Sequence, residues 1–115
     1  MDLTTVLKLQ EAGVDTEGAL RRFSGNSALY ERFLNKFLSD STFSQVTAAF
    51  EDRDEAEALT STHTLKGVTA NLGLDRLYSI SSDMVSLIRA GEFDQASAKY
   101  PELKAAYDEI CGILS

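Results

Sequence analysis

The chain has 115 residues, of which 43% are hydrophobic and 25% charged, as expected for one ordinary globular domain. Its 11 basic and 18 acidic residues give a net charge of -7, which argues against nucleic-acid or anionic-membrane partners, because these select basic patches. The single cysteine, Cys111, permits no internal disulfide or multi-cysteine metal site, and no apolar run is long enough to span a membrane, so we expect a cytoplasmic protein.

The N-terminal residues, about 1–25, predict one or two short helices, because their apolar residues recur at helical spacing. Asp15 is the expected N-cap of the second helix, and Gly25 is expected to end it. The residues expected to point inward are Leu3, Val6, Leu7 and Val14 from the first segment, and Leu20 and Phe23 from the second.

From about residue 26 the chain predicts four longer amphipathic helical segments. Asn26 or Ser27 is the expected cap of the first segment, and Ser39-Asp40-Ser41 marks a bend or a short break in it. Its apolar stripe is expected to comprise Leu29, Phe33, Leu34, Phe37 and Leu38, followed by Phe43, Val46 and Phe50.

The second long segment is expected to begin after Asp54 and to end at about Leu72, before Gly73. Asp54 followed three residues later by Glu57 is a capping-box pattern, and acidic residues near a helix start suit its dipole. The acids from Glu51 to Glu57 therefore predict a solvated turn, with a metal site as the alternative. The inner face is expected to hold Ala58, Ser61 or Thr62, Leu65, Val68 and Leu72.

Two further segments complete the helical pattern. One is expected to start at Asp75 and to be closed by Gly91, and in the other Pro101 marks either a kink or a fresh first turn. Their inward residues are expected to be Leu77, Ile80, Met84, Leu87 and Ile88, then Phe93, Ala96, Tyr100, Leu103, Tyr107, Ile110 and Leu114.

Four long amphipathic segments with short connections favour an all-α fold, an antiparallel four-helix bundle with one or two short additional N-terminal helices. A coiled-coil dimer is the alternative, but the apolar faces are wider than its two-in-seven seam. No internal repeat, linker or low-complexity tract divides the chain, so residues 1–115 predict a single domain, with the bundle over about 26–115 and a monomer as the default.

His63, the only histidine, lies in the middle of the segment after Asp54 and toward its outer side. An exposed neutral imidazole is a nucleophile at neutral pH. Lys66, one turn on, would offer charge-assisted hydrogen bonds to a phosphoryl group on the ring. Gly67 costs the helix about 1 kcal/mol relative to alanine, and the gap it leaves would let another protein reach the ring. The ordinary explanations are a polar surface histidine, a solvated lysine and a glycine that permits close helix packing.

The residues from His63 to Leu74, HTLKGVTANLGL, resemble the signature of histidine-containing phosphotransfer (HPt) domains of two-component phosphorelays. The resemblance extends to Gly13-Val14-Asp15, to the turn at Gly25 and to the turn at Gly91, so it covers nearly the whole chain. An HPt domain is an all-α module, in agreement with the helical pattern.

The resemblance implies that His63 is phosphorylated, that Lys66 steadies the phosphoryl group and that Gly67 leaves access for a receiver domain. Leu59, Ala70 and Asn71 on the same helix are the expected partner-binding residues, with burial of Leu59 against the preceding helix as the alternative. Some family members orient the imidazole with a polar side chain from the next helix. The comparable position here is Val85, which cannot hydrogen-bond, and the weaker substitutes on that helix are Ser82, Ser86 and Arg89.

These features predict a phosphoryl carrier rather than an enzyme with its own ATP site, since the chain has no glycine-rich phosphate loop. The expected partners are response-regulator receiver domains, which would bring the Mg²⁺, and an upstream hybrid sensor histidine kinase; no cofactor of its own is expected. The alternative is a helical bundle that binds receivers or other helices without carrying phosphate. A haem-binding bundle is disfavoured because the single histidine has no Cys-x-x-Cys-His attachment.

Overall fold

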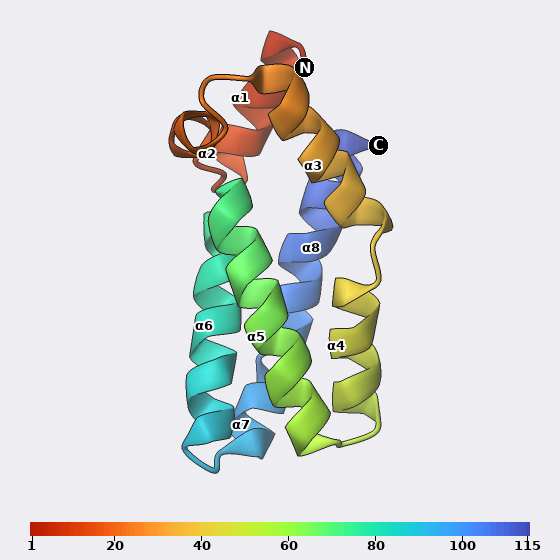
Figure 1. Ribbon diagram of the computed structural model, residues 1–115. Helices are drawn as coiled ribbons and strands as arrows, with labels where there is room; N and C mark the ends of the chain where they lie inside the picture. Colours follow the sequence, from red (N-terminus) through yellow and green to blue (C-terminus); the bar gives the residue numbers. More distant parts are fainter.

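The computed structural model describes all 115 residues, which form eight helices and no strand (Figure 1). The helices α4, α5, α6 and α8 lie along the length of the molecule, and α1, α2 and α3 gather at the end where both termini lie. The bounds are α1 Leu3–Glu11, α2 Thr16–Arg22, α3 Ser27–Ser39, α4 Thr42–Glu51, α5 Glu55–Leu72, α6 Asp75–Arg89, α7 Phe93–Ala98 and α8 Tyr100–Leu114.

Successive long helices run in opposite directions, so the fold is the all-α bundle that the sequence predicts (Figure 1). The helix α5 lies between α4 and α6, and α6 also contacts α7 and α8. The break expected near residue 40 is real: α3 ends at Ser39, and the Asp40 carboxylate accepts a hydrogen bond from the Thr42 amide at 2.9 Å. The helices α3 and α4 therefore share one side of the bundle in succession.

Strong local signals fix both ends of α5. The Asp54 side chain accepts a hydrogen bond from the Glu57 amide at 3.1 Å, as an N-cap does. At the other end Gly73 has a φ of +73°, and a Cβ there would lie 2.5 Å from the Asp15 carbonyl oxygen. Only glycine fits this left-handed position. The predicted bounds of this helix are confirmed.

The last carbonyl groups of α5 find partners on α2 and α3. Arg22 donates from Nε to the Asn71 carbonyl at 3.0 Å and from Nη2 to the Ala70 carbonyl at 2.9 Å. The buried hydroxyl of Tyr30 donates to the Leu72 carbonyl at 2.8 Å. Because terminal helix carbonyls have no partner within the helix, these bonds fasten the N-terminal region to the end of α5.

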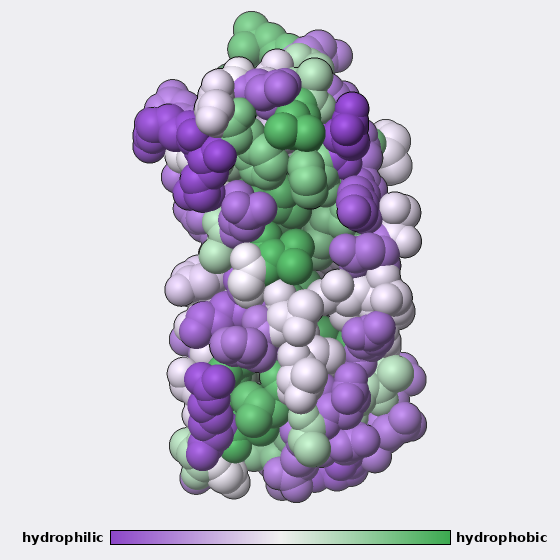
Figure 2. All heavy atoms as spheres, viewed as in Figure 1, coloured by the Kyte–Doolittle hydropathy of each residue, from purple (hydrophilic) through white to green (hydrophobic).

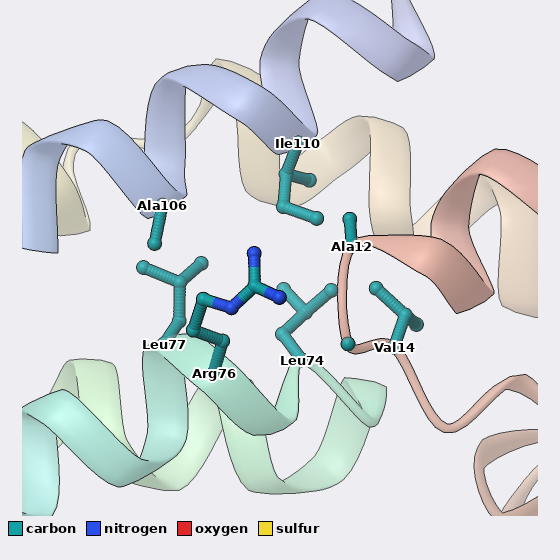
Figure 3. Close-up of a pocket in the computed structure, with 8 residues that line it drawn as sticks. Ala12, Val14, Leu74, Arg76, Leu77, Ala106 and Ile110 are labelled. Atoms are coloured by element: carbon teal, nitrogen blue, oxygen red, sulfur yellow. The ribbon is translucent and has the colours of Figure 1, made fainter.

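A second junction joins the end of α1 to α6 and α8 (Figure 3). The apolar side chains that meet there are Ala12, Val14, Leu74, Leu77, Ala106 and Ile110. The Arg76 side chain lies among them and donates to Glu109 at 2.8 Å. The junction is filled, with about 0 Å³ left for a water-sized molecule, so it is part of the packing rather than a ligand site.

The core is one cluster of 24 buried apolar residues that runs from Leu9 in α1 to Ile110 in α8. Aromatic rings close the seam between α4 and the last helices: Phe43 stacks on Tyr107 with ring centroids 3.9 Å apart, and Phe50 stacks on Phe93. Pro101 lies in the first turn of α8, so the last segment predicted from the sequence divides into two helices, α7 and α8. Of the two roles expected for the proline, the fresh first turn is confirmed.

Some residues expected to point inward do not. Leu3 is 72% exposed and Leu7 is 49% exposed, because α1 meets the bundle through Leu9 and its C-cap Ala12 instead. Phe33 of α3 is 39% exposed. Ten more are only half-buried at the edge of the core: Val6, Leu20, Phe23, Leu29, Leu38, Val68, Leu87, Tyr100, Tyr107 and Leu114.

Candidate functional site

His63 lies midway along the 18-residue helix α5, and its side chain is exposed. The opposite face of this part of the helix is buried through Ala58, Leu65 and Leu72, as the sequence predicts. Residues Ser61 and Thr62, given as alternatives for the inner face, are both buried. One face of the helix is therefore packed into the core, while the imidazole on the opposite face is exposed to solvent, where a second protein can approach it.

Lys66, one turn beyond His63, is half-buried, and its ammonium takes part in none of the ion pairs within the chain. On a helix, side chains three residues apart start about 5–6 Å from one another. The ammonium is thus within reach of a group carried on the His63 ring, and no carboxylate of the chain competes for it.

Gly67 is exposed in the same stretch of helix, and a Cβ built there would meet no atom within 4 Å. Its φ is not positive, so the backbone imposes no need for glycine. Close helix packing, the ordinary explanation for a glycine inside a helix, does not apply here. What the missing side chain provides is open space one turn from the imidazole.

The three expected partner-binding residues differ in exposure. Ala70 and Asn71 are exposed, and their carbonyl groups are the ones that Arg22 holds. Leu59 is half-buried and packs against the core cluster, so most of it serves the bundle and only an edge can reach a partner.

The helix α6 offers the imidazole no evident orienting group. Val85 is only 1% exposed, and its apolar side chain cannot hydrogen-bond. Ser82 is half-buried, whereas Ser86 and Arg89 are exposed. The hydroxyl of Ser81, fully buried on the same helix, has no hydrogen-bond partner.

The acidic residues around the start of α5 form an exposed turn, with Arg53 paired to Asp94 of α7. The chain has no group of three or more His, Cys, Asp or Glu side chains placed to hold a metal ion. None of the helices combines the length and the apolar character needed to cross a membrane.

Sequence reasoning missed a groove beside the site. It lies between α3 and the second half of α5, has a volume of about 230 Å³, and is lined by Phe33, Lys36, Val68 and Asn71 among others. The sequence holds no signal for this groove, because a phenylalanine within an apolar stripe, such as Phe33, looks the same in the sequence whether it is buried or half-exposed. Arg22 was missed because its partners lie 48 and 49 residues away in sequence.

One comparison with known proteins identifies the family of the chain. The family model described as Hpt domain matches residues 32–112, well over half of the chain. The match begins inside α3, so it leaves out α1, α2 and the start of α3 and is narrower than the nearly full-length resemblance expected from the sequence. No curated protein and no solved structure matches the chain. The chain belongs to the Hpt domain family, whose members carry out phosphotransfer in two-component phosphorelays.

Proposed function

We propose that this chain carries a phosphoryl group on His63, which accepts it from the aspartyl phosphate of one receiver domain and passes it to the aspartate of another. The observation that supports the proposal most is the exposure of the only histidine at the midpoint of a core-anchored helix. The unpaired ammonium of Lys66 and the open space over Gly67, both one turn beyond His63, support the same function.

In the proposed reaction the unprotonated ring nitrogen of His63 attacks the phosphorus of the acyl phosphate in line. A P–N bond forms as the P–O bond to the aspartyl carboxyl breaks, and the electron pair of that bond stays on the leaving carboxylate. The proton on the other ring nitrogen remains there, which leaves a phosphorylated imidazolium. The reverse steps deliver the group to the second receiver.

Such a transfer needs positioning and neutralisation of charge more than covalent machinery. In this proposal the bundle fixes the position of the ring, and Lys66 donates charge-assisted hydrogen bonds to the phosphoryl oxygens. The Mg²⁺ belongs to the receiver, and the phosphate originates from an upstream sensor kinase. This chain is a carrier between them, with no ATP chemistry of its own.

Label transfer tests the proposal. The protein is mixed with receiver domains that have been phosphorylated with labelled acetyl phosphate in the presence of Mg²⁺, and the label it gains is treated with acid and with alkali. We expect acid-labile, alkali-stable label in the wild type and none in His63→Gln. Label that persists in His63→Gln contradicts the proposal. Receiver binding without label in either protein would instead favour an interaction module that carries no phosphate.

A further inference from the structure

The ring of His63 takes part in none of the hydrogen bonds within the chain. Phosphoryl transfer nevertheless depends on which of its two nitrogens carries the proton. From Ala58 to Ala70 the helix has one charged residue, Lys66, and no carboxylate. Figure 2 shows side chains of intermediate hydropathy over the middle of this helix. An acceptor on α5 for the N–H of the ring must therefore be a neutral group.

Helix geometry places one such acceptor beside the ring, the hydroxyl of Thr60. A side chain on an α-helix leans toward the preceding turn, so the ring of His63 lies over the residues three and four positions earlier. The residue four positions earlier is the apolar, half-buried Leu59, whereas Thr60, three positions earlier, is exposed. Thr60 is about 4.5 Å from His63 along the axis and about 60° around it, so the two side chains are neighbours on one face.

The bond that Thr60 already makes determines how its hydroxyl can act toward the ring. Its Oγ1 donates to the Ala56 carbonyl at 3.1 Å. A hydroxyl has one proton and two lone pairs, so with the proton engaged the oxygen can only accept a further hydrogen bond. The exposed ring is free to change rotamer rapidly, and the donor that it offers in its neutral form is a single N–H.

We propose that Thr60 is a positioning residue for phosphoryl transfer: its Oγ1 accepts a hydrogen bond from Nδ1–H of His63 and so keeps Nε2 unprotonated and turned outward. The proposal rests on the proposed function and specifies what holds the ring in its reactive tautomer. Nδ1 is the nitrogen nearer the helix, because it adjoins the ring carbon bonded to Cβ. In free histidine the proton prefers Nε2, so an acceptor at Nδ1 favours the tautomer that can attack.

The same hydrogen bond suits both states of the ring. When Nε2 gains the phosphoryl group, Nδ1 keeps its proton and the ring becomes cationic, which strengthens a bond donated from Nδ1. Lys66 lies one turn away in the opposite direction along the helix, where it can hold the phosphoryl oxygens. Thr60 therefore acts on the ring, and Lys66 acts on the group that the ring carries.

The tautomer of the ring can be measured on the protein alone, without phosphate or a receiver. The ¹⁵N shifts of Nδ1 and Nε2 are recorded on ring-labelled protein in mildly alkaline buffer, for the wild type, Thr60→Val, Thr60→Ser and Thr64→Val. Valine removes the hydroxyl with little change in helix propensity, and serine retains it. Thr64→Val is the matched control, because Thr64 is also exposed and donates to a helix carbonyl, at 3.0 Å, but lies about 100° around the helix from His63.

We expect Thr60→Val to lower the ratio of the Nδ1–H to the Nε2–H tautomer about threefold, as the loss of one modest neutral hydrogen bond would. The single-turnover rate of label transfer from a phosphorylated receiver should fall by a similar factor, because the reactive tautomer is less populated. Thr60→Ser should restore both values, and Thr64→Val should change neither.

A tautomer ratio that is unchanged in Thr60→Val, or that changes equally in Thr64→Val, overturns the role of Thr60. A changed ratio with a wild-type transfer rate overturns it as well. In each of these cases label on His63 leaves the proposed function intact. Absence of label on His63 with every receiver overturns the proposed function itself, whatever the tautomer ratio.

Discussion

Substitution of Gly67 separates the stability of the helix from the access that the site needs. Glycine inside a helix is about 1 kcal/mol less favourable than alanine. At Gly67 the whole of this difference should be gained, because the position is inside α5, its φ is not positive, and an added Cβ meets no atom within 4 Å. We therefore expect Gly67→Ala to raise the free energy of unfolding by about 1 kcal/mol, which for a chain of this size raises Tm by about 4 °C.

Gly67→Gln should keep roughly half of that gain, because glutamine is also a good helix former. Its longer side chain would fill the space one turn from His63, and we expect the rate of phosphoryl transfer from a receiver to fall by at least about tenfold, since a misplacement of about 1 Å costs an oriented reaction that much or more. Urea denaturation measures the stability, and single-turnover label transfer measures the rate.

Gly112 supplies the control, because it lies within α8 and also has open space where a Cβ would be. Its replacement by alanine should stabilise the protein by about 0.5 kcal/mol, less than at Gly67 because it lies in the last turn, and should leave transfer unchanged. Loss of stability in Gly67→Ala would show that the glycine serves packing. Transfer at the wild-type rate in Gly67→Gln would refute the argument that the site needs the gap.

Four further substitutions test the residues that support the site. Tyr30→Phe should lower the free energy of unfolding by about 1–2 kcal/mol in urea, because it leaves the Leu72 carbonyl without its donor. Burial raises the pKa of Tyr30 from 10.0 to about 12. The contribution of this group to the free energy of unfolding should therefore be full below pH 10 and lost between pH 10 and 12. The Tyr30→Phe variant should lack this pH-dependent loss of stability. Thr62→Val should stabilise by about 1 kcal/mol, because the buried hydroxyl has no partner, whereas Thr69→Val should not, since that hydroxyl donates to a helix carbonyl at 2.8 Å. Lys66→Ala should still accept label but lose it faster in a decay time course, and an unchanged lifetime would remove Lys66 from the site.

The helix that carries the site could be predicted from sequence because its determinants are local. Asp54 caps the helix three residues from its bonding partner, and Gly73 ends it through its own φ. The position of His63 on the outer side then follows from the period of the helix, because Ala58 and Leu65 fix the inner side. The same local pattern brings His63, Lys66 and Gly67 together.

The surroundings of the helix depend on contacts between segments that are distant in sequence. The spacing of apolar residues along the chain carries no information about such contacts. Tyr30 and the Leu72 carbonyl are 42 residues apart, so no local pattern signals their bond. Leu3 and Leu7 satisfy an amphipathic pattern, but a helix as short as α1 can meet the bundle on either of two neighbouring faces, and tertiary packing selects the face with Leu9. The half-exposure of Phe33 was likewise decided by how α3 crosses α5.

The most direct test of the central claim is whether a P–N bond forms on the imidazole. The chain labelled with ¹⁵N in the ring of its only histidine is mixed with a phosphorylated receiver and Mg²⁺, and ³¹P NMR is recorded. A phosphorus signal split by a directly bonded ring nitrogen, and absent from His63→Gln, is the result this account predicts. A phosphorylated chain whose signal shows no such coupling, or a chain that takes no phosphate from any receiver, would contradict it.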